Sequence, residues 1–251
     1  MWNHPQPYLS LTNMFATILF MIMRRNEPVS RRTRPAKPAL TRAGIVGVAV
    51  RILREEGLER ATMRRIAIDL DTGPASLYVY VHNTAELHIA VLDQLLSDLD
   101  LRADTVEGRW QDRLVKLLVD YAQLLVAHPS LARSVLALRP SEPNYLRLAD
   151  SILALLHAGR VPAAQAAWGV DLLLLTATAI GAEQGTRDES VEAYEEADAA
   201  AVILGELAVE DYPNLTAVAR EIFSGTAEQR IRWTFSALIR GIGATATPAA
   251  D

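Results

Sequence analysis

The stretch TMRRIAIDLDTGPASLYVYVHN, residues 62–83, constrains the fold of this chain more than any other. Thr62 is a favourable helix N-cap, because its hydroxyl can accept a hydrogen bond from an otherwise unpaired N–H of the first turn. Apolar residues then recur at helical spacing up to the run DTGP at 71–74, where Gly permits positive φ and Pro suits the first turn of a new helix. A short second helix over 75–81 follows. This pattern is typical of a helix-turn-helix, whose second helix enters the DNA major groove.

The side chains of the second short helix are hard to explain as core residues alone. Ser76, Tyr78, Val79 and Tyr80 are expected to point outward. The two tyrosines lie two positions apart, so they cannot both face the core. We expect Tyr80 to be exposed to DNA, whereas Tyr78 either packs with a wet hydroxyl or joins the same surface.

Composition and charge place this motif in an all-α protein with an uneven charge distribution. Half of the 251 residues are hydrophobic, Ala and Leu dominate, and no strand pattern of useful length is present. Residues 24–65 hold twelve Arg and Lys against four Asp and Glu, whereas residues 98–251 hold thirteen against twenty-two. The basic part is therefore suited to meet an anion. The absence of cysteine excludes disulfides and thiolate metal sites, and it favours a cytoplasmic location.

The first 39 residues are expected to be a disordered extension and a basic arm. Residues 14–23 (MFATILFMIM) are apolar, but a bilayer-spanning helix needs roughly 20 such residues, and the basic residues follow the run rather than precede it. We therefore predict no membrane segment, and we expect translation to start at Met23. Residues 24–40 combine Arg and Lys with Pro, and either bind DNA as an arm or form a solvated tail.

The rest of the chain divides into a DNA-binding domain over 40–101, with its motif at 62–81, a helical effector-binding and dimerisation domain over 102–245, and a tail over 246–251. Thr41 is expected to cap a helix that Gly57 ends, and Asn83 to cap another, with Glu86 completing a capping box. In the second domain, helices are predicted near 108–127, 130–138, 143–158, 162–185, 190–208, 214–223 and 226–243.

The segment from Leu40 to Leu96 resembles the DNA-binding domain of TetR-type transcriptional repressors. The agreement rests on ILREEGLERATMRRIA, on Leu77-Tyr78 and on VHNTAEL. In the second domain, Trp110, the turn LRPSEPNY and the segment LIRGI are similar to the tetracycline-repressor branch. The resemblance implies a homodimer, a DNA operator as partner, and a small-molecule effector whose binding releases the DNA. The DNA-binding residues that the motif and the basic face then suggest are Arg42, Thr62, Arg64, Thr72, Gly73, Pro74, Ser76, Tyr78, Val79, Tyr80 and His82.

Three positions depart from the pattern of the family. Asp71 stands where the family usually has Gly, and Asp adopts the left-handed region at modest cost. Thr84 stands where a Lys commonly follows the Asn, so one phosphate partner is missing. The magnesium-binding His of the tetracycline repressors falls at Val135, which cannot bind a metal. Tetracycline–magnesium is therefore not the expected effector, and we predict no metal and no cofactor.

Apolar and amphipathic residues of the second domain supply candidates for an effector pocket and for a dimer interface. Helices near 162–185 and 226–243 are apolar on more than one side, which predicts a homodimer through a four-helix bundle. Trp168 and Tyr121 suit a ligand wall, because each has a large ring with one polar atom. The candidate ligand-binding residues are Trp110, Leu117, Tyr121, Val135, Trp168, Leu172 and Glu183.

No motif of enzyme chemistry is present, because the sequence lacks a GxSxG, a phosphate loop and His at metal-ligand spacing. The sequence predicts a ligand-responsive, dimeric repressor that binds a palindromic operator. Two alternatives stay open at this point, a helical protein-interaction module and a membrane-tethered regulator without operator binding.

Overall fold

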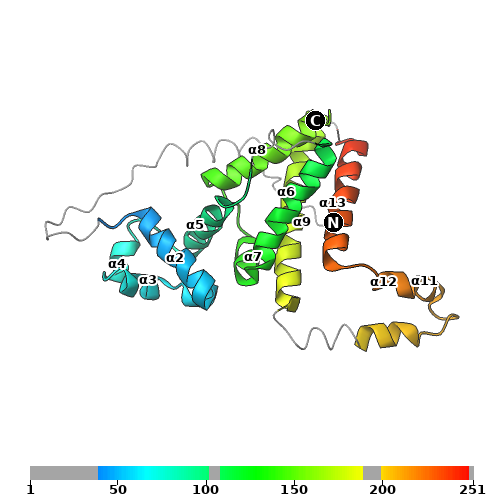
Figure 1. Cartoon of the computed structure of the whole chain (residues 1–251), viewed down its shortest axis with the longest axis horizontal. Helices are drawn as coiled ribbons and strands as arrows, with labels where there is room; N and C mark the ends of the chain where they lie inside the picture. Colours follow the sequence, from blue (N-terminus) through cyan, green and yellow to red (C-terminus); the bar gives the residue numbers. More distant parts are fainter. Residues whose placement is uncertain (1–38, 102–107, 189–198, 249–251) are drawn as a thin grey trace, which may run out of the picture.

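The computed structural model describes residues 39–101, 108–188 and 199–248, and every regular element within these ranges is a helix, as predicted (Figure 1). The apolar run at 14–23, the basic residues up to 38, and residues 190–198 of one predicted helix lie outside the described residues. The elements are α2 (Arg42–Glu56), η1 (Leu58–Arg60), α3 (Met63–Asp69), α4 (Pro74–Leu77), α5 (Thr84–Leu96), α6 (Trp110–Val126), α7 (Pro129–Val135), α8 (Pro143–Ala158), α9 (Ala163–Asp188), a helix over 199–205, α11 (Pro213–Ala217), α12 (Ala219–Ile222) and α13 (Ala227–Ala244).

Elements α2 to α5 form a small unit, called the head below, and α6 to α13 form the larger body. The predicted caps of the head are confirmed. The Thr41 hydroxyl accepts a hydrogen bond from the Gly44 N–H at 3.0 Å, and the Asn83 side chain accepts one from the Glu86 N–H at 2.8 Å. Gly57 ends α2 with φ 91°, a value that favours glycine, and its N–H donates to the Leu53 carbonyl at 3.1 Å.

The body is built around the contact between α6 and α9, with α7, α8 and α13 packed against the same long helix. Two glycines of α9 allow this close approach. A Cβ on Gly181 would lie 2.4 Å from Leu125 Cβ, and one on Gly185 would lie 2.5 Å from the Val126 carbonyl oxygen. Figure 1 shows α6 and α9 crossing in the middle of the body, with α13 beyond them.

One segment of the described chain, Ala163–Arg187 of α9, is long and apolar enough to cross a membrane. Its inner side is buried against α6, α7, α8 and α13, as is usual for the core helix of a globular domain. Its outer side carries the exposed residues Trp168, Leu172 and Leu175, which recur at helical spacing along one face. The apolar composition of α9 therefore has two sources, a core face and an outer face.

The region between α9 and α13 differs from the prediction of a single helix over 214–223. The backbone at Val218 has φ −123° and ψ 15°, which interrupts the helix between α11 and α12. Neither short helix buries a residue, so no packing compensates for the low helix propensity of a β-branched residue at this position. Helix α13 instead begins with a capping box formed by Thr226 and Gln229.

Candidate nucleic-acid interface

The turn between α3 and α4 agrees with the expectation for Asp71 and differs from the one for Gly73. Thr62 caps α3 as predicted, with its hydroxyl 3.2 Å from the Arg65 N–H. The left-handed residue of the turn is Asp71, with φ 49°, whereas Gly73 has φ −81°. The expectation that Gly73 supplies the positive φ is therefore wrong. A Cβ on Gly73 would meet no atom within 4 Å, so neither backbone conformation nor packing requires glycine here.

The two tyrosines that follow α4 have opposite environments. Tyr78 is 48% exposed and Val79 is exposed beside it, whereas Tyr80 is only 7% exposed and lies in the core with Val81. The expectation that Tyr80 faces DNA is therefore wrong. Helix α4 ends at Leu77, and the N–H groups of Tyr80 and Val81 both donate to the Leu77 carbonyl. This tight final turn brings Tyr80 inward, so a regular helical spacing does not apply.

Helix α3 carries two arginines, Arg64 and Arg65. Arg64 lies on its outer face and forms no ion pair with a carboxylate of the described residues. Its neighbour Arg65 pairs with Glu56 at 3.0 Å and also with Asp69. Arg51 and Arg54 form ion pairs as well, with Asp69 and Asp98. One helical turn after Arg64, Ile68 is 64% exposed, although the helical periodicity of the sequence did not single it out as a surface residue.

Arg42 and His82, two further candidates, are engaged with carboxylates. Arg42 lies 3.0 Å from Glu142 and 3.8 Å from Glu86. The Glu86 carboxylate accepts hydrogen bonds from the backbone N–H of His82 at 2.9 Å and from its ring at 2.8 Å. Burial raises the pKa of Glu86, but the bonds from His82 and the charge of Arg42 outweigh it and hold this pKa below its ordinary value. The predicted capping box is thus modified, because Glu86 reaches His82 rather than Asn83.

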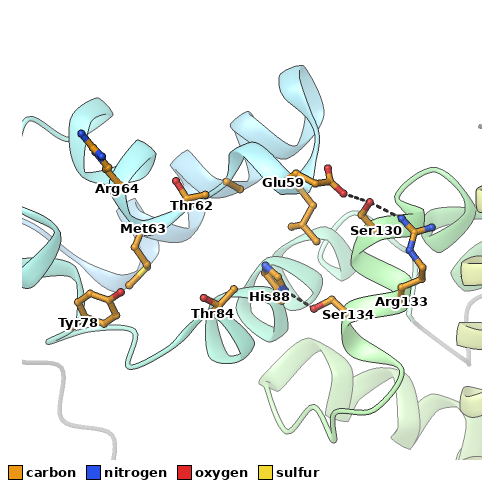
Figure 2. A pocket seen from close by; sticks show the side chains of 12 residues that line it. Glu59, Thr62, Met63, Arg64, Tyr78, Thr84, His88, Ser130, Arg133 and Ser134 are labelled. Carbon is orange, nitrogen blue, oxygen red and sulfur yellow. Dashed lines mark hydrogen bonds between the residues drawn. The ribbon is translucent and has the colours of Figure 1, made fainter.

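A cleft of about 710 Å³ lies between the head and α7, and residues of both line it (Figure 2). Thr62, Arg64, Tyr78 and Thr84 line one part of it, and the other part holds the polar contacts between the head and the body. There Ser130 of α7 donates a hydrogen bond to Glu59 of η1 and accepts one from Arg133 at 2.9 Å, while His88 of α5 contacts the Ser134 hydroxyl.

Two groups at this cleft have shifted pKa values. The hydrogen bond from Ser130 holds the pKa of the Glu59 carboxyl below its ordinary value. Burial lowers the pKa of His88, and the nearby charge of Glu59 opposes this only in part. At neutral pH the contact between head and body therefore holds a carboxylate and a neutral imidazole.

The seven candidate ligand-binding residues do not surround one cavity. Leu117, Tyr121 and Val135 are buried in the body, where the Tyr121 hydroxyl lies 3.1 Å from the Thr178 hydroxyl and burial raises the pKa of Tyr121. Trp110 lines a separate cavity of about 290 Å³ with Gly159, Arg160 and Arg240. Trp168, Leu172 and Glu183 are exposed on α9, because this helix buries its opposite side against α6 and α7.

Val135 occupies a buried position, and the described part of the chain holds no group of three His, Cys, Asp or Glu that could bind a metal ion.

A known family matches the body of the chain. The family described as "Tetracyclin repressor-like, C-terminal domain" matches residues 103–246, more than half of the chain. The chain belongs to the TetR family of transcriptional regulators.

Two solved structures are similar to this chain over most of its length. A protein named as transcription regulator SCO7704 of Streptomyces coelicolor is 47% identical, with a TM-score of 0.71 over 86% of this chain and 100% of that one. ActR from Streptomyces coelicolor, solved in complex with actinorhodin, is 33% identical, with a TM-score of 0.74 over 86% of this chain and 100% of its own.

Curated relatives match over a shorter length. The repressor DrrR1 of Streptomyces coeruleorubidus is 39% identical over 101 residues, which is 40% of this chain and 37% of DrrR1. The regulator from Saccharopolyspora erythraea is 28% identical over 49% of this chain and 51% of its own length. The chain thus spans between about a third and about half of the length of these two relatives.

Proposed function

We propose that this protein is a ligand-responsive transcriptional repressor that binds its operator through the outer face of α3 and α4. The observation that carries this proposal is a group of exposed residues on the head that do not help to pack the fold. Arg64 offers a guanidinium that has no carboxylate partner among the described residues, Tyr78 offers an exposed phenol that lines the same cleft, and Gly73 offers an unobstructed backbone. These groups suit phosphate oxygens, which position a protein on duplex DNA. The operator-binding set that we propose is Thr62, Arg64, Thr72, Gly73, Pro74, Ser76, Tyr78, Val79 and His82.

Sequence readout would come from the side chains that reach base edges. Ser76 and Val79 are exposed on the segment that enters the major groove in a helix-turn-helix. A serine hydroxyl can bond to a base edge, and a valine can contact a thymine methyl. Arg42 and Tyr80 leave the set, because Arg42 is mostly buried between two carboxylates and Tyr80 lies in the core. His82 also bonds to Glu86, but it stays because its side chain is 75% exposed.

We further propose that two copies associate through the outer faces of α9 and α13. Trp168, Leu172 and Leu175 of α9 and Trp233 of α13, which is 73% exposed, are large apolar side chains in contact with water on adjacent helices of the body. Pairing α9 and α13 with the same helices of a second copy would bury them in a four-helix bundle. A two-fold dimer would present two heads, which matches a palindromic operator in cytoplasmic DNA.

The effector is proposed to be a small molecule that binds in the body. ActR, a relative at 33% identity, was solved with actinorhodin and with (S)-DNPA. In this chain Tyr121 and Thr178 place a polar pair inside an apolar core between α6 and α9, and ligand sites commonly combine apolar walls with a few such groups. Ligand binding would favour a separation of the heads that no longer fits adjacent turns of the groove.

A gel-shift measurement with the DNA flanking the protein's own gene tests this proposal. We expect retardation that survives an excess of unrelated duplex at moderate salt, and that is reversed by a bound small molecule, with actinorhodin as the first probe. Retardation that unrelated DNA removes in full would contradict operator binding. Failure of actinorhodin alone would exclude that effector and leave operator binding intact.

A further inference from the structure

The side chain of Arg42 bridges the head and the body. Arg42 is the first residue of α2, and its side chain is only 20% exposed. One guanidinium nitrogen, Nη2, lies 3.0 Å from Glu142 Oε1 and 3.8 Å from Glu86 Oε1. Glu142 belongs to the body, where it is the N-cap residue of α8, and its side chain is 7% exposed. A cation thus lies between two carboxylates that come from different parts of the fold.

The same contact extends to the DNA-facing end of the head. Glu86 accepts two hydrogen bonds from His82, which follows the turn after α4. His82, Glu86, Arg42 and Glu142 therefore form one continuous polar connection, called the Arg42 bridge below. It begins within five residues of the exposed Tyr78 and ends at the first turn of α8.

A second contact fixes the same turn of α8 to the head. The Asp93 carboxylate of α5 accepts hydrogen bonds from the backbone N–H groups of Asn144 at 2.7 Å and Tyr145 at 3.0 Å. The Asn144 side chain donates to the Asp93 carbonyl at 3.0 Å. Because a helix N-terminus attracts negative charge, Asp93 and Glu142 are both favourably placed there. The first turn of α8 is thus held by α5 and by α2 at once.

We propose that Arg42 is a positioning residue that sets the orientation of the head relative to the body, and that it does not bind operator phosphate. The proposal rests on operator binding by the head. A displacement of α8 when an effector binds would move Glu142, and through the Arg42 bridge it would move the His82 end of the head. The body therefore contacts the DNA-facing surface of the head through α8 and α2, in addition to the contact between α7 and α5.

The first experiment measures the orientation of the head without DNA. The chain has no cysteine, so spin labels can be placed at Arg60→Cys in the head and Gln123→Cys in the body, both exposed positions. Labelled chain diluted with unlabelled chain reports the distance within one copy. We expect a narrow distance distribution in the parent protein, and a broader or shifted one in both Arg42→Met and Glu142→Gln. The matched control is Arg54→Met. It removes another arginine of α2, one that is exposed and paired with Asp98.

The second experiment is a double-mutant cycle on operator affinity at several salt concentrations. If the two residues act as one contact, Arg42→Met and Glu142→Gln each lower affinity about tenfold, and the double variant is no weaker than either. The salt dependence of binding then keeps its slope, because no phosphate contact is lost. A phosphate contact at Arg42 would instead lower that slope by about one, leave Glu142→Gln unaffected, and overturn the proposal.

The two experiments separate this proposal from the proposed function. Parent protein that binds no operator would remove the function, while the label distances would still decide whether Arg42 and Glu142 orient the head. Unchanged distances in both variants would overturn the positioning role, whatever the DNA result. If Arg42→Met melts at a lower temperature than the control and cannot be measured, Glu142→Gln carries the same test from the body side.

Discussion

The outer face of α3 and α4 and the outer face of α9 and α13 are both exposed, but their exposed side chains differ in kind. The first face presents a guanidinium, hydroxyls and a bare glycine on helices of seven and four residues. The second presents tryptophan and leucine on helices of 26 and 18 residues. Exposure alone therefore does not identify a partner. A free cation beside hydroxyls suits a polyanion, whereas a long apolar face suits a second copy of itself.

The two faces also differ in what holds them in place. The head face depends on a few buried residues beneath short helices, Leu77, Tyr80 and Val81, and on caps at Thr62 and Asn83. Short helices are not stable alone, so packing must fix the direction of each exposed side chain. The body face lies on two long helices that pack against each other and against the core of the body.

The largest effect is expected from charge on the body face. Replacing Leu172 and Trp233 together by Glu should convert the dimer to a monomer, because four carboxylates would meet at the bundle. Operator affinity should fall by a factor on the order of 10²–10⁴, since one head must then bind without its partner. Sedimentation velocity measures the association, and a gel shift the affinity. The control is Leu136→Glu, because Leu136 is 40% exposed, close to the 41% of Leu172, and lies on the body outside α9 and α13. A dimeric double variant with parent affinity would contradict the proposed interface.

The second prediction separates the two tyrosines of the head. Tyr80→Ala should lower the free energy of unfolding by about 3 kcal/mol, because it leaves a cavity in the core. Tyr78→Ala should change it by less than about 0.5 kcal/mol and weaken operator binding instead. Urea unfolding and fluorescence anisotropy with labelled operator measure the two effects. If Tyr78→Ala lost stability and kept affinity, the outer face would have been assigned to the wrong side of the head.

The third prediction concerns Arg64, which has no carboxylate partner among the described residues. Arg64→Ala should weaken operator binding about tenfold and lower the salt slope of log affinity by about one, because one phosphate contact is lost. Arg54→Ala is the matched control, since Arg54 is exposed but paired with Asp98. Anisotropy titrations between low and moderate salt provide both numbers. Equal slopes for the two variants would show that Arg64 does not contact phosphate.

The smallest effect is a pH dependence from two partly buried histidines, His88 at the contact between head and body and His128 at the N-cap of α7. Burial lowers the pKa of His88 and of His128 below the ordinary value of 6.5, so their neutral forms stabilise the fold above that pH. This stabilisation is lost as pH falls below 6.5 toward the lowered values. The free energy of unfolding should therefore decrease from pH 7 to pH 5.5, and His88→Gln combined with His128→Gln should flatten the decrease. Urea titrations at each pH are sufficient; an equally steep decrease in the double variant would assign the effect to other groups.

Comparison of the same two regions shows what the sequence could predict. The helix caps at Thr41, Thr62 and Asn83 were predictable, because each depends on atoms within three residues. The inward turn of Tyr80 was not, because it depends on where α4 ends. The partner of Arg42 lies 100 residues away in the chain, so no local pattern could reveal it.

For the body, helical periodicity identified α9 and α13 as apolar on more than one side, and the structure gives this pattern an inner and an outer face. It could not separate pocket residues from surface residues. Trp168 and Leu172 read as candidates for a ligand wall, and only the packing of α6 and α7 against the other side of α9 shows that they face outward.

Two heads, held together by α9 and α13, are proposed to bind one DNA duplex. Selection from a pool of random duplexes with the full-length protein tests this claim without knowledge of the natural operator. We predict that the enriched sequences form an inverted repeat whose half-sites lie about one or two helical turns apart, and that footprinting protects both halves. Enrichment of a single asymmetric site, or no enrichment at all, would contradict it.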